Sequence, residues 1–439
     1  MLSNNRENSK KDKLRYVFFE VPPALKSANV SCYLIGASLS FFGSWMTQIA
    51  LVWLVYQLTN SAMLVGVAGF TNQALGLIIT PLAGVLLDRW NLRYVLLTTQ
   101  LVSIILSSTL TFLTLSGQIN VTSIIVIGML QGIVKAFDLP ARQVIIPRLV
   151  DKKADTYSAM ASNSFLINTA KFVSPMIGGL MIARSGAASC FLVDSISYLP
   201  LLSAILTVRI KPLPKNSLAQ KPQIWKNLKE GFTFAYDFLP IKYALMLQML
   251  ICFMAMTYVN LIPIFVKEIL KGNAETMGFL MTASAFGSIV AGLYLISRKK
   301  IIGLGKVMAW SAAILGLSLI VFSRSTQLEI CFLFIFMIGM NNTLTLASIN
   351  NFTQLILVDE DKRGRVTSIF TTGFLGILPF GNLFFGGLAA QVGVANSLLF
   401  GGVCCVLGAY LFSTKLPTIS KLVQPIYVEM GLIPQSSQR

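Results

Sequence analysis

Two charged residues in the sequence lie inside long apolar segments. Lys171 falls near the middle of one segment, and Asp194 lies in the next. A lysine at that depth costs about 2.5 to 3.5 kcal/mol on insertion scales unless it faces water or a partner. Lys171 is therefore a candidate contact for an anionic or carbonyl-rich substrate; a structural pair with a neighbouring polar group and a coupling role are the alternatives.

Asp194 is the first candidate for a proton carrier, because a carboxylate among apolar groups can take up a proton. A hydrogen-bonded structural role fits it equally well. A direct pair with Lys171 would need a long reach, because the two positions differ in depth by about 10 Å at 1.5 Å per helical residue. Asp138 is the second candidate carrier, and it lies four residues before Arg142, the spacing of a helical ion pair.

A further charged group lies in a short stretch between two apolar runs. It contains Gly84, Asp88, Arg89 and Arg93. An acid and two guanidinium groups this close to the end of a hydrophobic segment suit a polar clamp at the membrane surface better than a solvated loop.

Amide side chains inside the apolar runs outnumber the charges. Amides are rare in lipid without partners, so most of them are expected to face the interior of a helix bundle. Each one taken singly is more often a contact between helices than a substrate contact. The set includes Gln48, Gln131, Gln248, Asn341 and Asn342.

The composition is that of an integral membrane protein, since 55% of the 439 residues are apolar and 12% are charged. The net charge of +18 does not indicate a nucleic-acid partner, because the basic residues fall in the gaps between apolar runs. The six cysteines lack metal-ligand spacing, and the chain has no histidine, so no metal site is expected. Any proton coupling must use carboxylates.

The apolar runs predict an all-α integral membrane protein with twelve transmembrane helices in two pseudo-symmetric six-helix halves. Many secondary transporters consist of two similar halves of this kind. The expected spans lie near 30–58, 62–87, 94–115, 119–138, 158–183, 188–208, 243–266, 277–296, 307–323, 328–355, 366–390 and 394–414. The expected organisation is a tail at 1–29, a first half at 30–208, a basic linker at 209–242, a second half at 243–414 and a tail at 415–439.

The basic residues set the expected orientation. With the N-terminus inside, Arg184, Lys267, Lys271 and Arg324 are the ones that fall outside, and Lys135 is counted with the inner loop after its span. This bias predicts a multi-pass protein of the inner (plasma) membrane with both termini in the cytoplasm.

The linker contains a stretch, 224–238, whose apolar residues share one helical face with aromatic residues at its edge. This pattern predicts an amphipathic helix that lies along the inner membrane surface. A solvated linker is the alternative.

The clamp stretch resembles the loop between spans 2 and 3 of the major facilitator superfamily, with its glycine, its Asp-Arg pair and its final arginine in place. Asn91 stands where that family usually has glycine, and Leu92 stands where a basic residue is common. Span 5 contains Ser174, Pro175, Gly178 and Gly179, which resemble a signature of exporters in the superfamily, with Ser174 in place of a glycine.

Two further runs narrow the resemblance. Ala136 to Gln143, together with Ser44 to Met46 and Leu51 to Tyr56, are similar to the transmembrane secretion effector branch. That branch includes enterobactin exporters and is close to macrolide efflux proteins. The resemblance covers spans 1 to 6 well and spans 7 to 12 thinly.

The resemblance implies a conformational latch made of Gly84, Asp88, Arg89, Arg93, Asp138 and Arg142. Asp88 would face the N-terminus of span 11, where the helix dipole favours an anion, and Arg89 or Arg93 would reach Asp138. These contacts would form when the cavity is open to the outside. Spans 1, 4, 7 and 10 would surround the cavity, which makes the five amides named above candidate cavity residues. The span-5 motif would serve helix packing, and the superfamily's default is a monomer.

These features predict a secondary transporter in the lipid bilayer that exports a small organic molecule, such as a siderophore or an amphipathic drug-like compound. No phosphate-binding loop is present, so the expected energy source is the proton gradient, used by antiport without a cofactor. Uptake of an iron chelate or metabolite is the alternative. A membrane-embedded enzyme or a lipid scramblase is the alternative from a different class; against the enzyme, the sequence has no His-rich cluster, no paired intramembrane carboxylates and no nucleophile with an adjacent base.

Overall fold

The computed structural model describes residues 23–87, 90–150, 155–211, 233, 236–298, 303–357 and 360–429. Every element in these ranges is helical, and twelve of the helical segments are long and apolar enough to cross a membrane. The predicted fold class and the number of spans are therefore confirmed.

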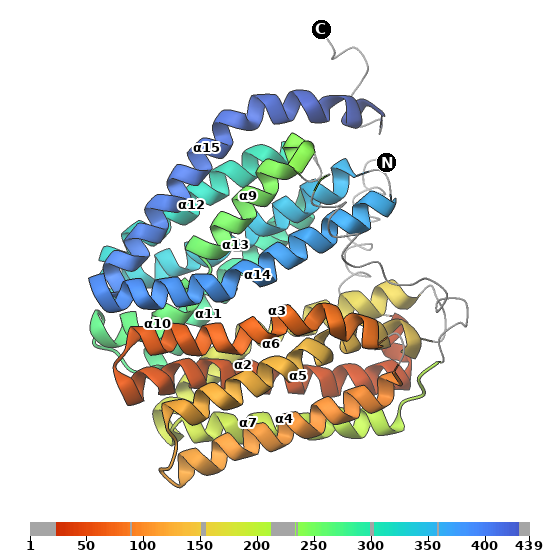
Figure 1. Cartoon of the computed structure of the whole chain (residues 1–439), viewed down its shortest axis with the longest axis vertical. Helices are drawn as coiled ribbons and strands as arrows, with labels where there is room; N and C mark the ends of the chain where they lie inside the picture. The colour runs from red at the N-terminus through yellow and green to blue at the C-terminus, as the bar shows by residue number, and fades with distance from the viewer. Residues whose placement is uncertain are drawn as a thin grey trace, which may run out of the picture.

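The helices form two bundles, which Figure 1 shows one above the other. The first bundle contains the short 3-10 helix η1 (Pro23–Lys26), α2 (Ala28–Thr59), α3 (Ala62–Leu87), α4 (Leu92–Leu115), α5 (Val121–Leu149), α6 (Thr156–Ser185) and α7 (Ala187–Thr207). The second contains α9 (Leu239–Met254), α10 (Tyr258–Glu268), α11 (Ala274–Ser297), α12 (Leu304–Arg324), α13 (Leu328–Ile356), α14 (Glu360–Val392) and α15 (Val394–Glu429).

Polar residues at the turns explain where several helices begin. The side-chain oxygens of Asn91, Asn120 and Asn273 accept backbone N–H groups of the first turns of α4, α5 and α11. These bonds satisfy donors that a helix start leaves without an intrahelical acceptor. Gly186 and Gly393 make the tight exits after α6 and α14 with φ of 77° and 85°, a region that favours glycine.

Helix α5 is longer than the sequence analysis expected, and this is a correction. The expected span ended at 138, but α5 continues to Leu149 through Pro140 and Pro147. Neighbouring helices in a bundle can satisfy the backbone groups that a proline frees, so the prolines do not end the helix. Lys135 consequently lies in the middle of α5 and not beside a loop.

The seventh span is broken into two helices. The backbone N–H of Met256 reaches back five residues to the carbonyl of Ile251 at 3.1 Å, and α10 begins at Tyr258. At the other end of the second bundle, α15 runs on to Glu429, so the tail expected from 415 is helical to that point. Most of the linker stretch 224–238 lies outside the described residues.

The two bundles meet at the end away from the chain termini and diverge toward the termini (Figure 1). We call the meeting end the distal end. A Cβ on Gly386 of α14 would lie 2.6 Å from the Cα of Gly66 in α3, and a Cβ on Gly278 of α11 would lie 2.9 Å from the Cα of Gly179 in α6. Both pairs lie near the distal ends of their helices, so glycines allow the two backbones to touch there.

A polar contact also joins the bundles at the distal end. The Tyr56 hydroxyl donates to Glu268 Oε1 at 2.5 Å. Lys267 Nζ donates to Asn60 Oδ1 at 3.0 Å and lies 5.2 Å from the centre of the Tyr56 ring. The distal end is thus closed by both backbone contact and side-chain hydrogen bonds.

We expect Gly386→Ala to open the distal end, because its methyl group would overlap the backbone of α3. Overpacking of this kind costs about 1 to 3 kcal/mol, enough to shift a two-state population by roughly 5- to 150-fold. Gly387→Ala is the matched control, since a Cβ there meets only Met63 Sδ at 3.5 Å. Spin labels at Ser116 and Thr326, in a cysteine-free background, would report the distance between the bundles. Equal distance distributions for the two variants would contradict the glycine contact as the closing element.

Candidate functional site

A cavity of about 550 Å³ lies inside the first bundle. Its lining residues come from α2, α4, α5, α6 and α7, and they include five charged side chains. The volume falls in the range of sites for small organic molecules. The first bundle, which contains the cavity, is in contact with the second bundle at the distal end.

Six of the residues singled out in the sequence line this cavity together. They are Gln48, Gln131, Asp138, Arg142, Lys171 and Asp194. They come from four different helices and are far apart in the sequence. Their roles in binding and coupling remain predictions, but they share one space.

The remaining three amide candidates lie in the second bundle and are not among the lining residues of this cavity. Gln248 Nε2 donates to the Phe370 carbonyl at 2.7 Å, from α9 to α14. Asn341 Nδ2 donates to the Met337 carbonyl of its own helix at 2.8 Å. Asn342 Oδ1 is buried without a hydrogen bond. Substrate contact by these three therefore stays a prediction that this arrangement does not support.

Asp138 and Arg142 form a buried ion pair in the cavity wall, with 2.6 Å between Arg142 Nε and Asp138 Oδ2. Asp138 Oδ1 accepts hydrogen bonds from Gln100 Nε2 at 2.6 Å and from Thr99 Oγ1 at 3.0 Å. The Arg142 guanidinium donates to Ser40 Oγ at 2.9 Å and to Gln100 Oε1 at 3.2 Å. The pair therefore connects α2, α4 and α5. Gln100 was missed in the sequence, where it is one more amide in an apolar run.

The expected latch is only partly visible. Asp88 and Arg89 lie outside the described residues, and Gly84 lies near the end of α3. The Arg93 guanidinium donates to the Val208 carbonyl, so it does not take Asp138 as its partner in this conformation. The i,i+4 pair with Arg142 holds Asp138, because the two groups are one helical turn apart and already buried together.

Asp194 lies deep in the wall of the cavity and is 1% exposed. Its Oδ2 accepts a hydrogen bond from Ser107 Oγ at 2.7 Å. Its Oδ1 is buried without a hydrogen bond and faces α2, where a Cβ on Gly43 would lie 2.9 Å away. A carboxylate oxygen that accepts no hydrogen bond has a free position at which a proton can bind.

Lys135 is the cavity residue that sequence reasoning missed. It lies on α5, is half-buried, and makes no hydrogen bond or ion pair with the residues that the structure describes. Because the span was expected to end at 138, Lys135 was counted with the loop that follows. The apolar run Val144, Ile145, Ile146 after that point was the available sign that the helix continues.

Lys171 reaches the same cavity from α6. Its Nζ lies 5.3 Å from the centre of the Trp45 ring, a cation–π distance. Among the described residues it makes no ion pair with Asp194, as the difference in depth indicated. A cation–π contact contributes about 0.5 to 1 kcal/mol at accessible sites and leaves the positive charge uncancelled.

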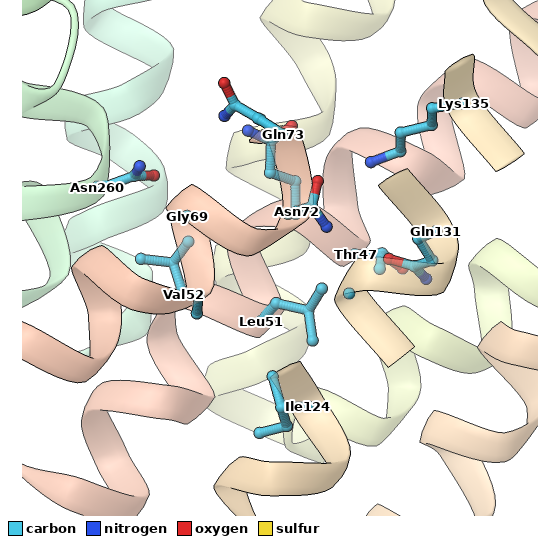
Figure 2. Close-up of a pocket in the computed structure, with 13 residues that line it drawn as sticks. Thr47, Leu51, Val52, Gly69, Asn72, Gln73, Ile124, Gln131, Lys135 and Asn260 are labelled. Carbon is cyan, nitrogen blue, oxygen red and sulfur yellow. The ribbon is translucent and has the colours of Figure 1, made fainter. Parts of the chain in front are cut away.

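A smaller pocket of about 40 Å³ extends the polar lining toward the second bundle (Figure 2). It shares Thr47, Gln48, Gln131 and Lys135 with the main cavity. In Figure 2 Lys135 points from α5 into this pocket, and Asn260 of α10 lies on the opposite side. Lys135 therefore borders both spaces.

The span-5 motif lies in the contact between helices. Ser174, Pro175, Gly178 and Gly179 are buried in α6. Gly179 and the Pro175 carbonyl lie against Gly278 of α11 in the second bundle, while a Cβ on Gly178 would lie 3.6 Å from Met46 of α2. Placement of the motif at both contacts fits a packing role.

The family described as transmembrane secretion effector matches residues 25–426. The chain belongs to this family. It is therefore a transporter of the major facilitator superfamily and not an enzyme, and it is a multi-pass membrane protein.

Curated relatives of the family cover most of the chain. The staphyloferrin A transporter of Staphylococcus aureus is 28% identical over 386 residues, which cover 86% of this chain and 94% of the relative. The multidrug efflux pump Tap of Mycolicibacterium fortuitum is 23% identical over 81% of this chain and 88% of the relative. The macrolide efflux protein A of Streptococcus pyogenes is 22% identical over 59% of this chain and 64% of its own length.

Solved structures share the fold at low identity. A transporter of the POT family in complex with 5-aminolevulinic acid matches with a TM-score of 0.70 and 13% identity, over 92% of this chain and 98% of that one. The nucleoside transporter NupG matches with a TM-score of 0.66 and 16% identity, over 89% of this chain and 99% of that one.

We expect Arg142→Leu to destabilise the protein by about 3 to 5 kcal/mol, because Asp138 would remain buried without its counter-charge. The double variant Asp138→Leu, Arg142→Leu should recover most of that loss, since it removes both charges. Thermal unfolding in detergent, with the exposed Arg184→Leu as the control, would measure the difference. A single variant as stable as the control would show that the pair does not hold the bundle together.

Proposed function

We propose that this transporter exports a small organic molecule across the bacterial plasma membrane by alternating access. The observation that carries the proposal is the cavity of about 550 Å³, which is lined by charges and amides and lies within a molecule that is closed at its distal end. Alternating access requires such a site between a closed end and an end that can open.

The orientation supports export. Basic residues gather in the segments on the side of the termini, which favours cytoplasmic termini. With cytoplasmic termini the distal end would face outward, and a transporter closed at that end would receive its substrate from the cytoplasm. Two of the relatives are named efflux proteins, which fits this direction.

The substrate we propose is a siderophore or a drug-like amphipathic compound. The cavity offers Trp45 and Phe41 for an apolar or aromatic part and amides for hydrogen bonds. A monomer is the expected working unit, since the cavity and both bundles belong to one chain.

We propose proton antiport as the energy source, with Asp194 as the carrier. Asp194 lines the cavity and has one oxygen free, whereas both oxygens of Asp138 are already engaged by Arg142, Gln100 and Thr99. A proton would have to compete with a directly paired guanidinium at Asp138, whereas the neighbours of Asp194 are the hydroxyl groups of Ser107, Thr47 and Tyr198 and the more distant charge of Lys135.

We expect a deletion strain to retain an iron-regulated small molecule that the complemented strain secretes. Mass spectrometry of spent medium and cytosol, from cells grown with and without iron, would detect the molecule inside the mutant and its loss outside. Unchanged secretion together with reduced uptake of an added chelate would replace export by import. Unchanged secretion together with lower drug tolerance would favour multidrug efflux.

We expect Asp194→Asn to abolish acceleration of transport by a pH gradient, because an amide of the same shape cannot carry a proton. Proteoliposomes loaded with the secreted molecule, with and without an imposed gradient, would measure this. Ser107→Ala is the matched control, since it removes the hydrogen bond to Asp194 but keeps the carboxyl group. A full response of Asp194→Asn to the gradient would assign the proton to another residue.

A further inference from the structure

The charges that line the cavity do not cancel. Lys135, Lys171 and Arg142 are positive, and Asp138 and Asp194 are negative. Arg142 is held by Asp138 in the ion pair described above. Asp194 takes its hydrogen bond from a serine and not from a lysine.

The cavity therefore has one net positive charge, and its two lysines are the cations without an ion pair; Asp194 offsets part of the Lys135 charge from a distance. Neither lysine makes a hydrogen bond or an ion pair with the residues that the structure describes; Lys171 has the Trp45 ring beside it. Charges in a low-dielectric bundle cost free energy unless they face water, a partner or a ligand. Lys171 is exposed and Lys135 is half-buried, so water reaches both in the ligand-free protein and both ammonium groups are open to a ligand in the cavity.

The lysines approach the cavity from different walls. Lys135 comes from α5 and borders both the main cavity and the smaller pocket, and Lys171 comes from α6. A ligand that contacts both must carry two separated acceptor groups. The Trp45 ring beside Lys171 offers a flat surface for an apolar or aromatic part of the ligand.

We infer that the cavity binds an organic anion with at least two anionic oxygen groups, such as carboxylates, with Lys135 and Lys171 each contacting one of them. This inference deepens the proposed function by naming the class of substrate, and it rests on the cavity being the substrate site. Gln48 and Gln131, which line both spaces, supply amide donors for the remaining oxygens. A substrate with two protonated amines would be repelled by the same lysines.

Binding to the purified protein tests the inference directly. The probes are benzene-1,3-dicarboxylate, its neutral diamide and benzene-1,3-dimethanamine, which share a ring and a spacing but carry two negative charges, none and two positive charges. We expect the dicarboxylate to bind tightest, measured by tryptophan fluorescence or thermal shift. Lys135→Gln and Lys171→Gln should each weaken it by about tenfold or more, because each removes a hydrogen bond between charged groups.

Two controls separate binding from folding. Lys306→Gln makes the same charge change at an exposed position outside the cavity and should leave binding unchanged. The melting temperature of the ligand-free cavity variants should stay the same or rise, because a cation without an ion pair has been removed. A lower melting temperature with unchanged dicarboxylate binding would assign the lysines a structural role and overturn the inference. Equal binding of dicarboxylate and diamide would overturn it as well.

A cellular arm separates this inference from the proposed function. The molecule that the complemented strain secretes should be retained by an anion-exchange resin at neutral pH, and its secretion should fall in the two cavity variants but not in Lys306→Gln. A neutral or cationic molecule secreted equally by all variants would overturn the anion site and leave export intact. Lysine-dependent binding of the dicarboxylate without any secretion would keep the anion site and overturn export.

Discussion

The buried ion pair between Asp138 and Arg142 is the interaction on which the polar interior of the first bundle depends. The pair places a guanidinium and a carboxylate in the core of three helices, where either charge alone would be very costly. Gln100 closes the arrangement, because its amide nitrogen donates to the acid and its amide oxygen accepts from the arginine. With this pair neutralised internally, the free charges that remain in the cavity are those that a ligand or a proton can address.

The two bundles differ in the polar groups that they contribute. All five charged residues of the cavity belong to the first bundle. The second bundle contributes buried amides that bond to backbone carbonyls, and it closes the distal end through Gly278 and Gly386. Contacts between glycine backbones have no flexible side chains to adjust, so such an interface favours a fully closed or a separated state over intermediate ones. In the proposed cycle the first bundle, which contains the cavity, would rock against the second bundle.

The sequence predicted the twelve spans because apolar length is a strong signal in a membrane protein. It also identified Lys171, Asp194 and Asp138 as candidate functional residues, because a charge in an apolar run is rare. Lys135 and Gln100 escaped for different reasons. The expected span ended at 138 and Lys135 was counted with the loop that follows, whereas the role of an amide such as Gln100 depends on the helix that packs against it. Helix rotation, which decides whether a residue faces the cavity, is set by packing and cannot be read from the apolar pattern.

Asp194 and the two lysines share one cavity, so a proton and an anion bound there influence each other. Protonation of Asp194 removes a negative charge from the cavity, which favours an anion near Lys135. Local electrostatics alone would thus let the proton and the anion bind together, whereas antiport requires that they travel in opposite directions. Under antiport, the conformational change must then prevent transport of the proton and the anion together. The form with a bound proton would open to the cytoplasm, and the form with a bound anion would open to the outside. Under the proposed antiport the membrane potential would assist the exchange, because an anion that leaves a negative interior and a proton that enters it would both move with the field, at about 2.3 kcal/mol per charge per 100 mV.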